Sequence, residues 1–217
     1  MEFQRIDRRS WPRDACFNHY FHAVPCTYSM TVKLDITPIR RQGVKLYPAM
    51  LYALCTVVNR HAEFRTSLDE AGNVGVFSDM VPCYTIFHKD SETFSNIWTE
   101  YHPRFSEFLR AYQQDLQRYG QNPGLEAKPG TPANSFPVSM IPWTTFDGFN
   151  LNLPNGAGYL LPIFTMGKFY QQEDRYWLPL SVQVRHGVCD GFHLCRFINE
   201  LQELIRQEGI FAAGEPV

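Results

Sequence analysis

The chain has 217 residues and a nearly balanced charge, with 20 Lys and Arg residues against 22 Asp and Glu residues. Hydrophobic residues make up 44% of the chain and charged residues 19%, which is typical of a packed globular protein and excludes a disordered one. So small a net charge predicts no nucleic acid partner and no anionic membrane surface. The longest apolar run, Tyr47–Val58, is too short to span a bilayer, and the charged first residues lack the apolar core of a signal peptide. We therefore expect a soluble, cytoplasmic protein.

The cysteines and histidines show no metal-binding pattern. No C-x-x-C pair and no H-E-x-x-H sequence occurs, so we expect reduced thiols and no metal site. The glycine motifs of dinucleotide and P-loop sites are also missing. Phe, Tyr and Trp together make up 15% of the chain, enough to line a large apolar pocket as well as a core.

Hydrophobic periodicity predicts strands and helices that alternate along the chain. In chain order they are a strand over 28–36, a helix over 48–61, a strand over 81–88, a helix over 105–119, strands over 136–140, 160–166 and 176–186, and a helix from about 191 to 205. The Gly- and Pro-rich stretch 120–137 predicts a long connecting loop, and we expect the tail after Gly209 to be poorly ordered. We expect an α/β (α+β) two-layer sandwich, a mixed β-sheet covered by helices, with residues 1–217 as a single domain.

The segment LPLSVQVRHGVCDGFHL, residues 178–194, carries the strongest chemical signal. Alternation along a strand separates an apolar face from a polar one, namely Leu180, Val182, Val184 and His186 against Ser181, Gln183 and Arg185. A histidine on an apolar face is more stable in its neutral form, which is the form that a general base needs. A pattern as short as H-x-x-x-D also fits a packed core histidine followed by an aspartate that only caps a helix.

A longer stretch favours the catalytic interpretation. SVQVRHGVCDGFHLCRFINELQ closely resembles the active-site signature of the chloramphenicol acetyltransferases, written around H-H-A-V-C-D-G. Further blocks resemble the same family in its order, among them NHYFHAVPCTYSMTVKLDIT, LYPAMLYALCTVVNRHAEFR, FHKDSETFS, PVSMIPWTTFDGFNLN and IFTMGKFYQQEDRYWLPLSVQV. The resemblance implies a CoA-dependent acyltransferase-like fold, a homotrimer, and acetyl-CoA-dependent acetylation of the 3-hydroxyl of chloramphenicol, which confers antibiotic resistance.

The resemblance also implies roles for individual residues. His186 is the general base that takes the proton of the acceptor hydroxyl, and Ser139 is the donor that stabilises the oxyanion. Thr165 helps to hold a water near the same intermediate. Asp190 pairs with Arg13, without touching the histidine as a triad member would, and so holds the histidine loop in place.

Both substrates are assigned residues by the same resemblance. The site is expected between subunits, with the base of one copy facing an acceptor held mostly by its neighbour. The acceptor pocket is assigned to Tyr20, Val24, Cys26, Tyr28, Phe94, Leu151 and Leu153. The CoA channel is assigned to Trp143, Lys168 and Phe169.

The sequence departs from the family pattern at three places. The first histidine of the family's His-His pair is Arg185 here, and the following alanine is Gly187. Glu126 stands at about the place of an aromatic residue of the acceptor pocket. Because the catalytic member of the pair is the second histidine, Arg185 is not expected to remove the base.

Several alternatives remain open at this point. Cys189 beside His186 would allow a cysteine nucleophile and an acyl-enzyme, although a buried apolar role is favoured. His193 is expected to pack against the helix. The second enzyme candidate is a related CoA-dependent acyltransferase with another hydroxyl or thiol acceptor. A dihydrolipoyl acyltransferase is one such enzyme, which shares an H-x-x-x-D-G signature but usually carries N-terminal lipoyl segments. A non-catalytic binder of a hydrophobic drug is a third, although such a binder needs neither His186 nor Ser139.

Overall fold

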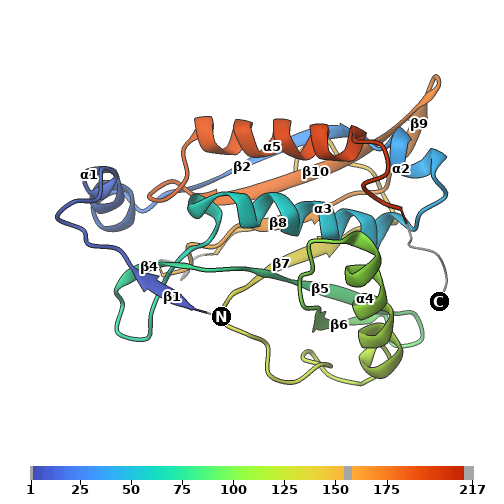
Figure 1. Cartoon of the computed structure of the whole chain (residues 1–217), viewed down its shortest axis with the longest axis horizontal. Helices are drawn as coiled ribbons and strands as arrows, with labels where there is room; N and C mark the ends of the chain where they lie inside the picture. Colours follow the sequence, from blue (N-terminus) through green and yellow to red (C-terminus); the bar gives the residue numbers. More distant parts are fainter. Residues whose placement is uncertain (1, 154–157, 213–217) are drawn as a thin grey trace.

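A computed structural model describes residues 2–153 and 158–212. Its centre is a mixed sheet of seven strands in the order β2-β10-β8-β7-β5-β6, with β9 paired to β10 (Figure 1). Neighbours β5, β7 and β8 run parallel and the other pairs run antiparallel. The strands are β2 (Thr27–Asp35), β5 (Val81–His88), β6 (Thr93–Trp98), β7 (Ser135–Met140), β8 (Ile163–Met166), β9 (Tyr170–Gln172) and β10 (Arg175–Arg185). A second, small sheet has the order β1-β4-β3, formed by β1 (Phe3–Arg5), β3 (Thr66–Leu68) and β4 (Val74–Phe77).

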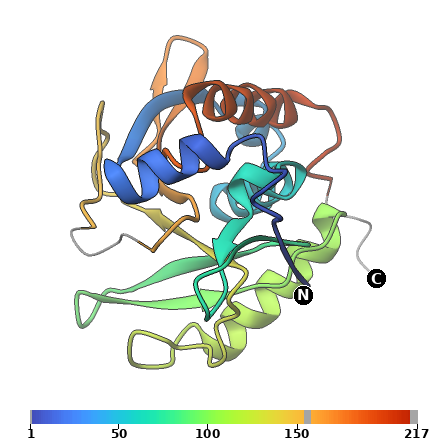
Figure 2. The ribbon, with the colours of Figure 1, turned by 90° about the vertical axis from the view of Figure 1, so that its left-hand side faces the viewer.

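Helices cover one face of the large sheet. The long ones are α3 (Leu46–Arg60), α4 (Phe105–Tyr119) and α5 (Gly191–Arg206), and α3 runs beside α5 in front of the strands (Figure 1). Shorter elements are α1 (Asp14–Asn18), the π-helix His19–Ala23, α2 (Thr37–Arg41) and the 3₁₀ turn Ala62–Phe64. Figure 2 looks at the molecule from the end where α1 lies. None of the helices described has the length and apolarity that a bilayer span needs.

The burial of each helix follows from its sequence. Eleven of the 15 residues of α3 are buried, so this helix is apolar on nearly all sides and lies inside the helical layer. By contrast, α4 buries only Phe105, Phe108 and Tyr112 and shows a polar face to solvent. On α5, Phe197 stacks on Phe164 of β8 with ring centroids 5.4 Å apart. Aromatic contacts of this kind join the helical layer to the sheet.

The predicted long elements are confirmed with small shifts. The helix expected over 105–119 has those bounds, and the other two differ by one or two residues. The strand expected over 160–166 begins only at Ile163, because Pro162 has no N–H to donate in a strand that is paired on both sides. The strand expected to include His186 ends at Arg185. The small sheet, β6, β9, α1 and α2 were not predicted.

Candidate active site

His186 lies in the loop between β10 and α5, not on the apolar strand face where the sequence pattern placed it. Leu180, Val182 and Val184 are buried in the core, whereas the side chain of His186 is 29% exposed. Its backbone N–H donates to the carbonyl oxygen of Cys26 at 3.1 Å. The alternation therefore predicted the face of each core residue correctly and failed for the residue that follows the strand.

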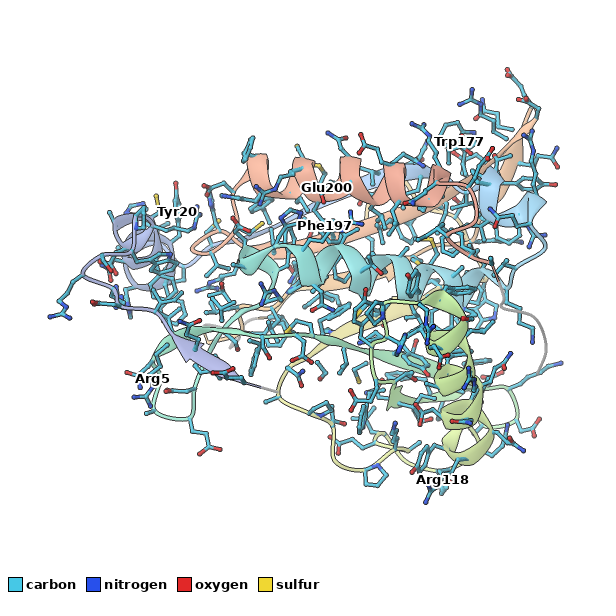
Figure 3. The ribbon with its side chains drawn as sticks, viewed as in Figure 1. Arg5, Tyr20, Arg118, Trp177, Phe197 and Glu200 are labelled. Atoms are coloured by element: carbon cyan, nitrogen blue, oxygen red, sulfur yellow. The ribbon has the colours of Figure 1, made fainter. Side chains whose placement is uncertain are left out.

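Two tyrosines surround the imidazole of His186. The ring of Tyr20, in the π-helix, is stacked on it with centroids 3.9 Å apart and an interplanar angle of 7°. Tyr28 of β2 meets it edge-on at 5.5 Å and donates its hydroxyl to the carbonyl oxygen of Cys189 at 3.2 Å. Figure 3 labels Tyr20 at the end of the molecule where α1 lies. Tyr20, Cys26 and Tyr28, assigned to the acceptor pocket, thus belong to the surroundings of His186, and Val24 follows the same π-helix as an exposed side chain.

Arg13 holds the loop that carries His186. Its guanidinium donates to both oxygens of Asp190, at 2.7 Å and 2.5 Å, to the carbonyl oxygen of Gly187 at 2.9 Å and to that of His186 at 3.0 Å. The planar five-donor group of arginine suits such a set of acceptors, and the point charge of lysine does not. The hydrogen bond to Arg13 lowers the pKa of Asp190 below its usual value, so this carboxylate is charged at neutral pH. The expected contact between Arg13 and Asp190 is present.

Asp190 approaches His186 closely but does not hydrogen-bond to it as a triad member would. Asp190 Oδ1 lies 3.2 Å from His186 Nδ1, because the carboxylate that faces Arg13 also borders the imidazole. The alignment of this contact is not that of a hydrogen bond, and Nδ1 is buried without a hydrogen-bond partner among the described residues. The carboxylate therefore favours a proton on Nδ1 electrostatically and leaves Nε2 as the nitrogen available to a substrate.

Ser139 and Thr165 lie together elsewhere on the sheet. Ser139 of β7 is directly opposite Thr165 of β8, which is opposite Ser181 of β10. Both Ser139 and Thr165 line a cavity of about 660 Å³, between the β5–β6 hairpin, the end of β7 and α4. Its walls are mostly apolar and include residues that the sequence analysis assigned to substrates, namely Phe94, Trp143 and Leu151, together with Thr85, Ile86, Phe87 and Phe149, which it missed.

Polar side chains of β10 fix one wall of this cavity. Ser181 donates its hydroxyl to the carbonyl oxygen of Phe149 at 2.6 Å, and Gln183 accepts the N–H of Leu151 at 3.0 Å. These contacts satisfy backbone groups of a segment that has no regular secondary structure. The polar face predicted for β10 is therefore present, and it serves to hold the Phe149–Leu151 segment in place.

Some assigned substrate residues lie outside the cavity. The exposed Lys168 follows β8, and its N–H donates to the carbonyl oxygen of Thr144. Phe169 lies beneath the guanidinium of Arg40, 4.9 Å from the ring centroid. Leu153 is exposed at the end of the first described range. Within one chain these residues do not join the cavity with Ser139.

The expected site is thus divided into two clusters. Arg185, the last residue of β10, follows Ser181 by four residues, which is about 13 Å at the strand rise of about 3.3 Å per residue, and His186 comes after it. Ser139 is level with Ser181 in the strand register but lies on β7, which β8 separates from β10. A general base must come within about 3 Å of the proton that it removes. His186 and Ser139 of the same chain therefore cannot serve one substrate hydroxyl.

The comparisons with known proteins agree with one another. The family model described as chloramphenicol acetyltransferase matches residues 1–202. A curated chloramphenicol acetyltransferase of Vibrio anguillarum is 63% identical over 206 residues, covering 95% of this chain and 95% of that protein. The chain belongs to the chloramphenicol acetyltransferase family.

The fold agrees with membership of the chloramphenicol acetyltransferase family. A solved chloramphenicol acetyltransferase superposes with a TM-score of 0.82 at 22% identity, covering 94% of this chain and all of that one. A dihydrolipoamide acetyltransferase of Azotobacter vinelandii has a TM-score of 0.62 at 16% identity, covering 88% of this chain and 86% of that one. The CoA-dependent acyltransferase-like fold expected from the sequence is confirmed.

The departures from the signature of the chloramphenicol acetyltransferases have distinct surroundings. Arg185 is only 5% exposed, and its Nε and Nη2 have no hydrogen-bond partner among the described residues. Burial lowers the pKa of its guanidinium, which lies 5.5 Å from the ring centroid of Phe21. Glu126 is exposed and forms a β-bridge with Asn96 beside β6.

The surroundings of Cys189, the alternative nucleophile, disfavour its thiolate. Cys189 is 1% exposed, and burial raises the pKa of its thiol to about 12. Because the thiolate is the reactive form, such a thiol is a poor nucleophile at neutral pH. The structure therefore favours the buried apolar role.

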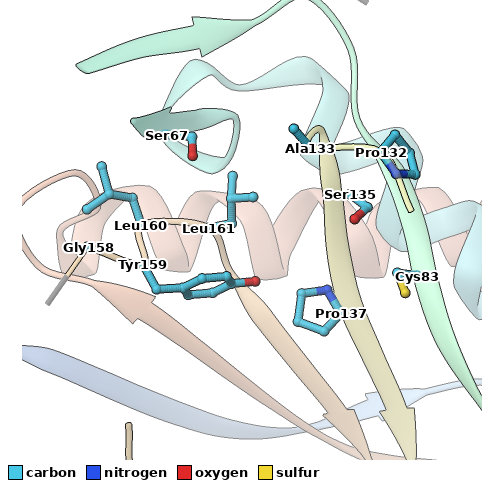
Figure 4. A pocket seen from close by; sticks show the side chains of 10 residues that line it. All are labelled: Ser67, Cys83, Pro132, Ala133, Ser135, Pro137, Gly158, Tyr159, Leu160 and Leu161. Atoms are coloured by element: carbon cyan, nitrogen blue, oxygen red, sulfur yellow. The ribbon is translucent and has the colours of Figure 1, made fainter. Parts of the chain in front are cut away.

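Other possible sites lie apart from both clusters. A second cavity, of about 350 Å³, lies between the start of β7 and the segment Gly158–Leu161, with Cys83 and Tyr159 at its wall (Figure 4). Burial raises the pKa of the Cys83 thiol to about 11. Within residues 2–153 and 158–212, no three His, Cys, Asp or Glu side chains are grouped as metal ligands would be.

Proposed function

We propose that this chain transfers the acetyl group of acetyl-CoA to the 3-hydroxyl of chloramphenicol and so confers resistance to the antibiotic. The observation that carries the proposal is the His186 loop: a partly exposed imidazole between two tyrosines, in a loop clamped by Arg13 and Asp190. Membership of the chloramphenicol acetyltransferase family supports the choice of reaction. Because acetyl-CoA is a cytoplasmic metabolite, we place the activity in the cytoplasm.

His186 acts as general base through Nε2, since Nδ1 is buried beside Asp190. It accepts the proton of the acceptor hydroxyl while the hydroxyl oxygen bonds to the thioester carbonyl carbon. Ser139 donates its hydroxyl to the oxyanion that results, and Thr165 holds a water near it. When the carbon–sulfur bond breaks, the imidazolium returns the proton to the CoA sulfur, so that the ester and free CoA leave and the base is neutral again. These steps use side chains and the two substrates only, and no metal.

The complete site forms between two copies of the chain, which we propose to be neighbours in a homotrimer. The separation of His186 from Ser139 supports this arrangement. Exposed apolar side chains at both clusters support it as well, because apolar side chains gathered on a surface are typical of interaction sites. They are Val24 near His186, and Phe87, Phe94, Trp143 and Leu151 at the cavity.

A thiol-release assay tests the reaction. Purified protein is mixed with acetyl-CoA and chloramphenicol, and free CoA thiol is followed with a disulfide reagent. We expect thiol that depends on chloramphenicol and a product whose mass is greater by one acetyl group. Release with dihydrolipoamide but not with chloramphenicol would replace the proposed acceptor, and binding of chloramphenicol without turnover would show a binder.

Mixed oligomers test the shared site. His186→Ala and Ser139→Ala are expected to lose ~10²–10⁴-fold and ~10²–10³-fold in rate. When the two inactive variants are co-expressed, random assembly into a ring joins an intact His186 to an intact Ser139 at about a quarter of the sites. We expect that share of the wild-type activity to return. Activity that stays at the level of the single variants would show that each chain carries its own site.

A further inference from the structure

The loop that carries His186 has a second support, on the side of α5. At the start of this helix, the backbone N–H of Asp190 donates to Nδ1 of His193 at 3.1 Å. His193 Nε2 lies 3.3 Å from Glu63 Oε1, and Glu63 Oε2 accepts from Arg196 Nη2 at 3.2 Å. Glu63 belongs to the 3₁₀ turn that follows α3, so these contacts join the loop to the helical layer.

The hydrogen bond from Asp190 fixes the tautomer of His193. A backbone N–H can only donate, so the Nδ1 that faces Asp190 must be unprotonated. The proton of the neutral ring is then on Nε2, which points to Glu63. A carboxylate close to a ring N–H stabilises the proton there electrostatically and so leaves the other nitrogen as the acceptor. Glu63 therefore supports the bond between His193 and Asp190.

The electrostatic surroundings keep His193 neutral. Burial lowers the pKa of His193 most strongly, and the charges of Arg13 and Arg196 act in the same direction. Glu63 and Asp190 act in the opposite direction. Together these groups lower the pKa of His193 below its usual value, so Nδ1 remains an acceptor at neutral pH.

Packing also holds the loop, in which Val188 and Cys189 are each 1% exposed. Arg13, Glu63 and His193 all border a cavity of about 520 Å³, whose other walls include Trp11, Cys16 and Val188. The polar contacts of Arg13 and of the Glu63–His193 pair add to this packing on the side of the cavity.

We propose that Glu63 and His193 are positioning residues for the base, which hold the backbone at Asp190 and thereby the place of His186. Neither residue touches the substrates. The proposal rests on the acetyl transfer proposed above, because the orientation of His186 is what it is meant to preserve.

The chain offers a matched control. His61 and Glu200 form a second His–Glu pair, with Nε2 and Oε2 2.9 Å apart. Glu200, labelled in Figure 3, lies ten residues after Asp190 and hence about 15 Å further along α5. His61→Leu thus removes the same kind of contact from the same helical layer without touching the loop.

The experiment compares kcat, the KM for chloramphenicol and thermal stability in His193→Leu and His61→Leu. Displacement of a catalytic group by about 1 Å can cost ~10²-fold in rate, so we expect His193→Leu to lower kcat at least tenfold with little change in KM. We expect His61→Leu to leave kcat within about twofold of the wild type. His193→Gln should restore most of kcat, since its side-chain amide can accept from Asp190 and donate to Glu63.

If His193→Leu does not fold, the kcat, KM and thermal stability of Glu63→Ala are compared with those of His61→Leu instead. Glu63→Ala leaves the bond between His193 and Asp190, and removes the carboxylate beside His193 together with its contact to Arg196. Together with His193→Leu it should lower kcat no further than His193→Leu alone, because both act through one contact. Equal kcat in His193→Leu and His61→Leu, or a defect confined to KM, would overturn the proposal. A wild type without acetyl transfer would instead contradict the proposed function.

Discussion

The imidazole ring of His186 lies parallel to the phenol ring of Tyr20, with centroids 3.9 Å apart and 7° between the ring planes. The stack covers one face of the imidazole, and Tyr28 meets the ring edge-on. Rotation of the imidazole would break the stack. Tyr20, which family resemblance assigns to the acceptor pocket, is therefore placed to orient the base in its own chain.

Substitution of Tyr20 separates these two roles. We expect Tyr20→Phe to keep the stack and to retain kcat. Tyr20→Leu loses a ring pair worth about 0.5–1.5 kcal/mol, so kcat should fall about 2–10-fold. Steady-state kinetics at varied chloramphenicol concentration would measure both parameters. A rise in KM with unchanged kcat would show that Tyr20 binds the acceptor and does not orient the base.

The ion pair of Arg13 and Asp190 predicts a second result. Asparagine caps a helix as well as aspartate, so Asp190→Asn keeps the cap and removes the charge partner of Arg13. Unpairing a deeply buried charge costs 3–5 kcal/mol, roughly, and we expect less here because Asp190 is 38% exposed. Both melting temperature and kcat should fall, and Arg13→Val should be milder. Additive effects in the double variant would show that the two residues are not coupled.

The same pair predicts a pH dependence of stability. In the folded chain, the hydrogen bond from Arg13 lowers the pKa of Asp190 below the value of about 3.9 for a free aspartate. Above that value the unfolded and folded carboxyls are both charged, and the stabilisation is fully present. It is lost as the pH falls through the lower folded pKa. The difference in melting temperature between wild type and Asp190→Asn should stay constant from neutral pH to about 5 and narrow below about 4. A difference that grows on acidification would contradict this assignment.

Arg185 predicts a gain of stability. Its guanidinium is 5% exposed, with two nitrogens that have no partner within the described chain, and a buried unpaired charge is unfavourable. Arg185→His introduces the family's usual residue and removes the permanent charge. We expect a higher melting temperature, by about 2–4 °C for each kcal/mol, with kcat within a few-fold. A lower melting temperature together with loss of the oligomer would show that Arg185 binds a group of a second copy.

How far the sequence predicts this fold depends on the length of each element. The helix over 105–119 was predicted with its bounds because its apolar residues recur with helical spacing. The strands β1, β3 and β4 have three or four residues each, too few for a period to be recognised, and only their pairing with one another identifies them. The π-helix that carries Tyr20 has no such signal either.

The candidate site was also predicted only in part. The contact of Arg13 with Asp190 spans 177 residues and was predicted from family resemblance, not from any local pattern. Glu63 lies in a turn of three residues and reaches His193 only because α3 packs beside α5. The separation of His186 from Ser139 depends on strand register, which a list of motifs does not contain.

The clamp of Arg13 has a consequence for the order of folding. Its acceptors are the carbonyl oxygens of His186 and Gly187 and the carboxylate of Asp190, at least 173 residues further along the chain. During synthesis, the N-terminal arm must wait for almost the whole chain before these acceptors exist. Closing so long a loop is entropically costly, and contacts of this range form slowly. The base therefore acquires its working geometry late, when the first and last parts of the chain meet.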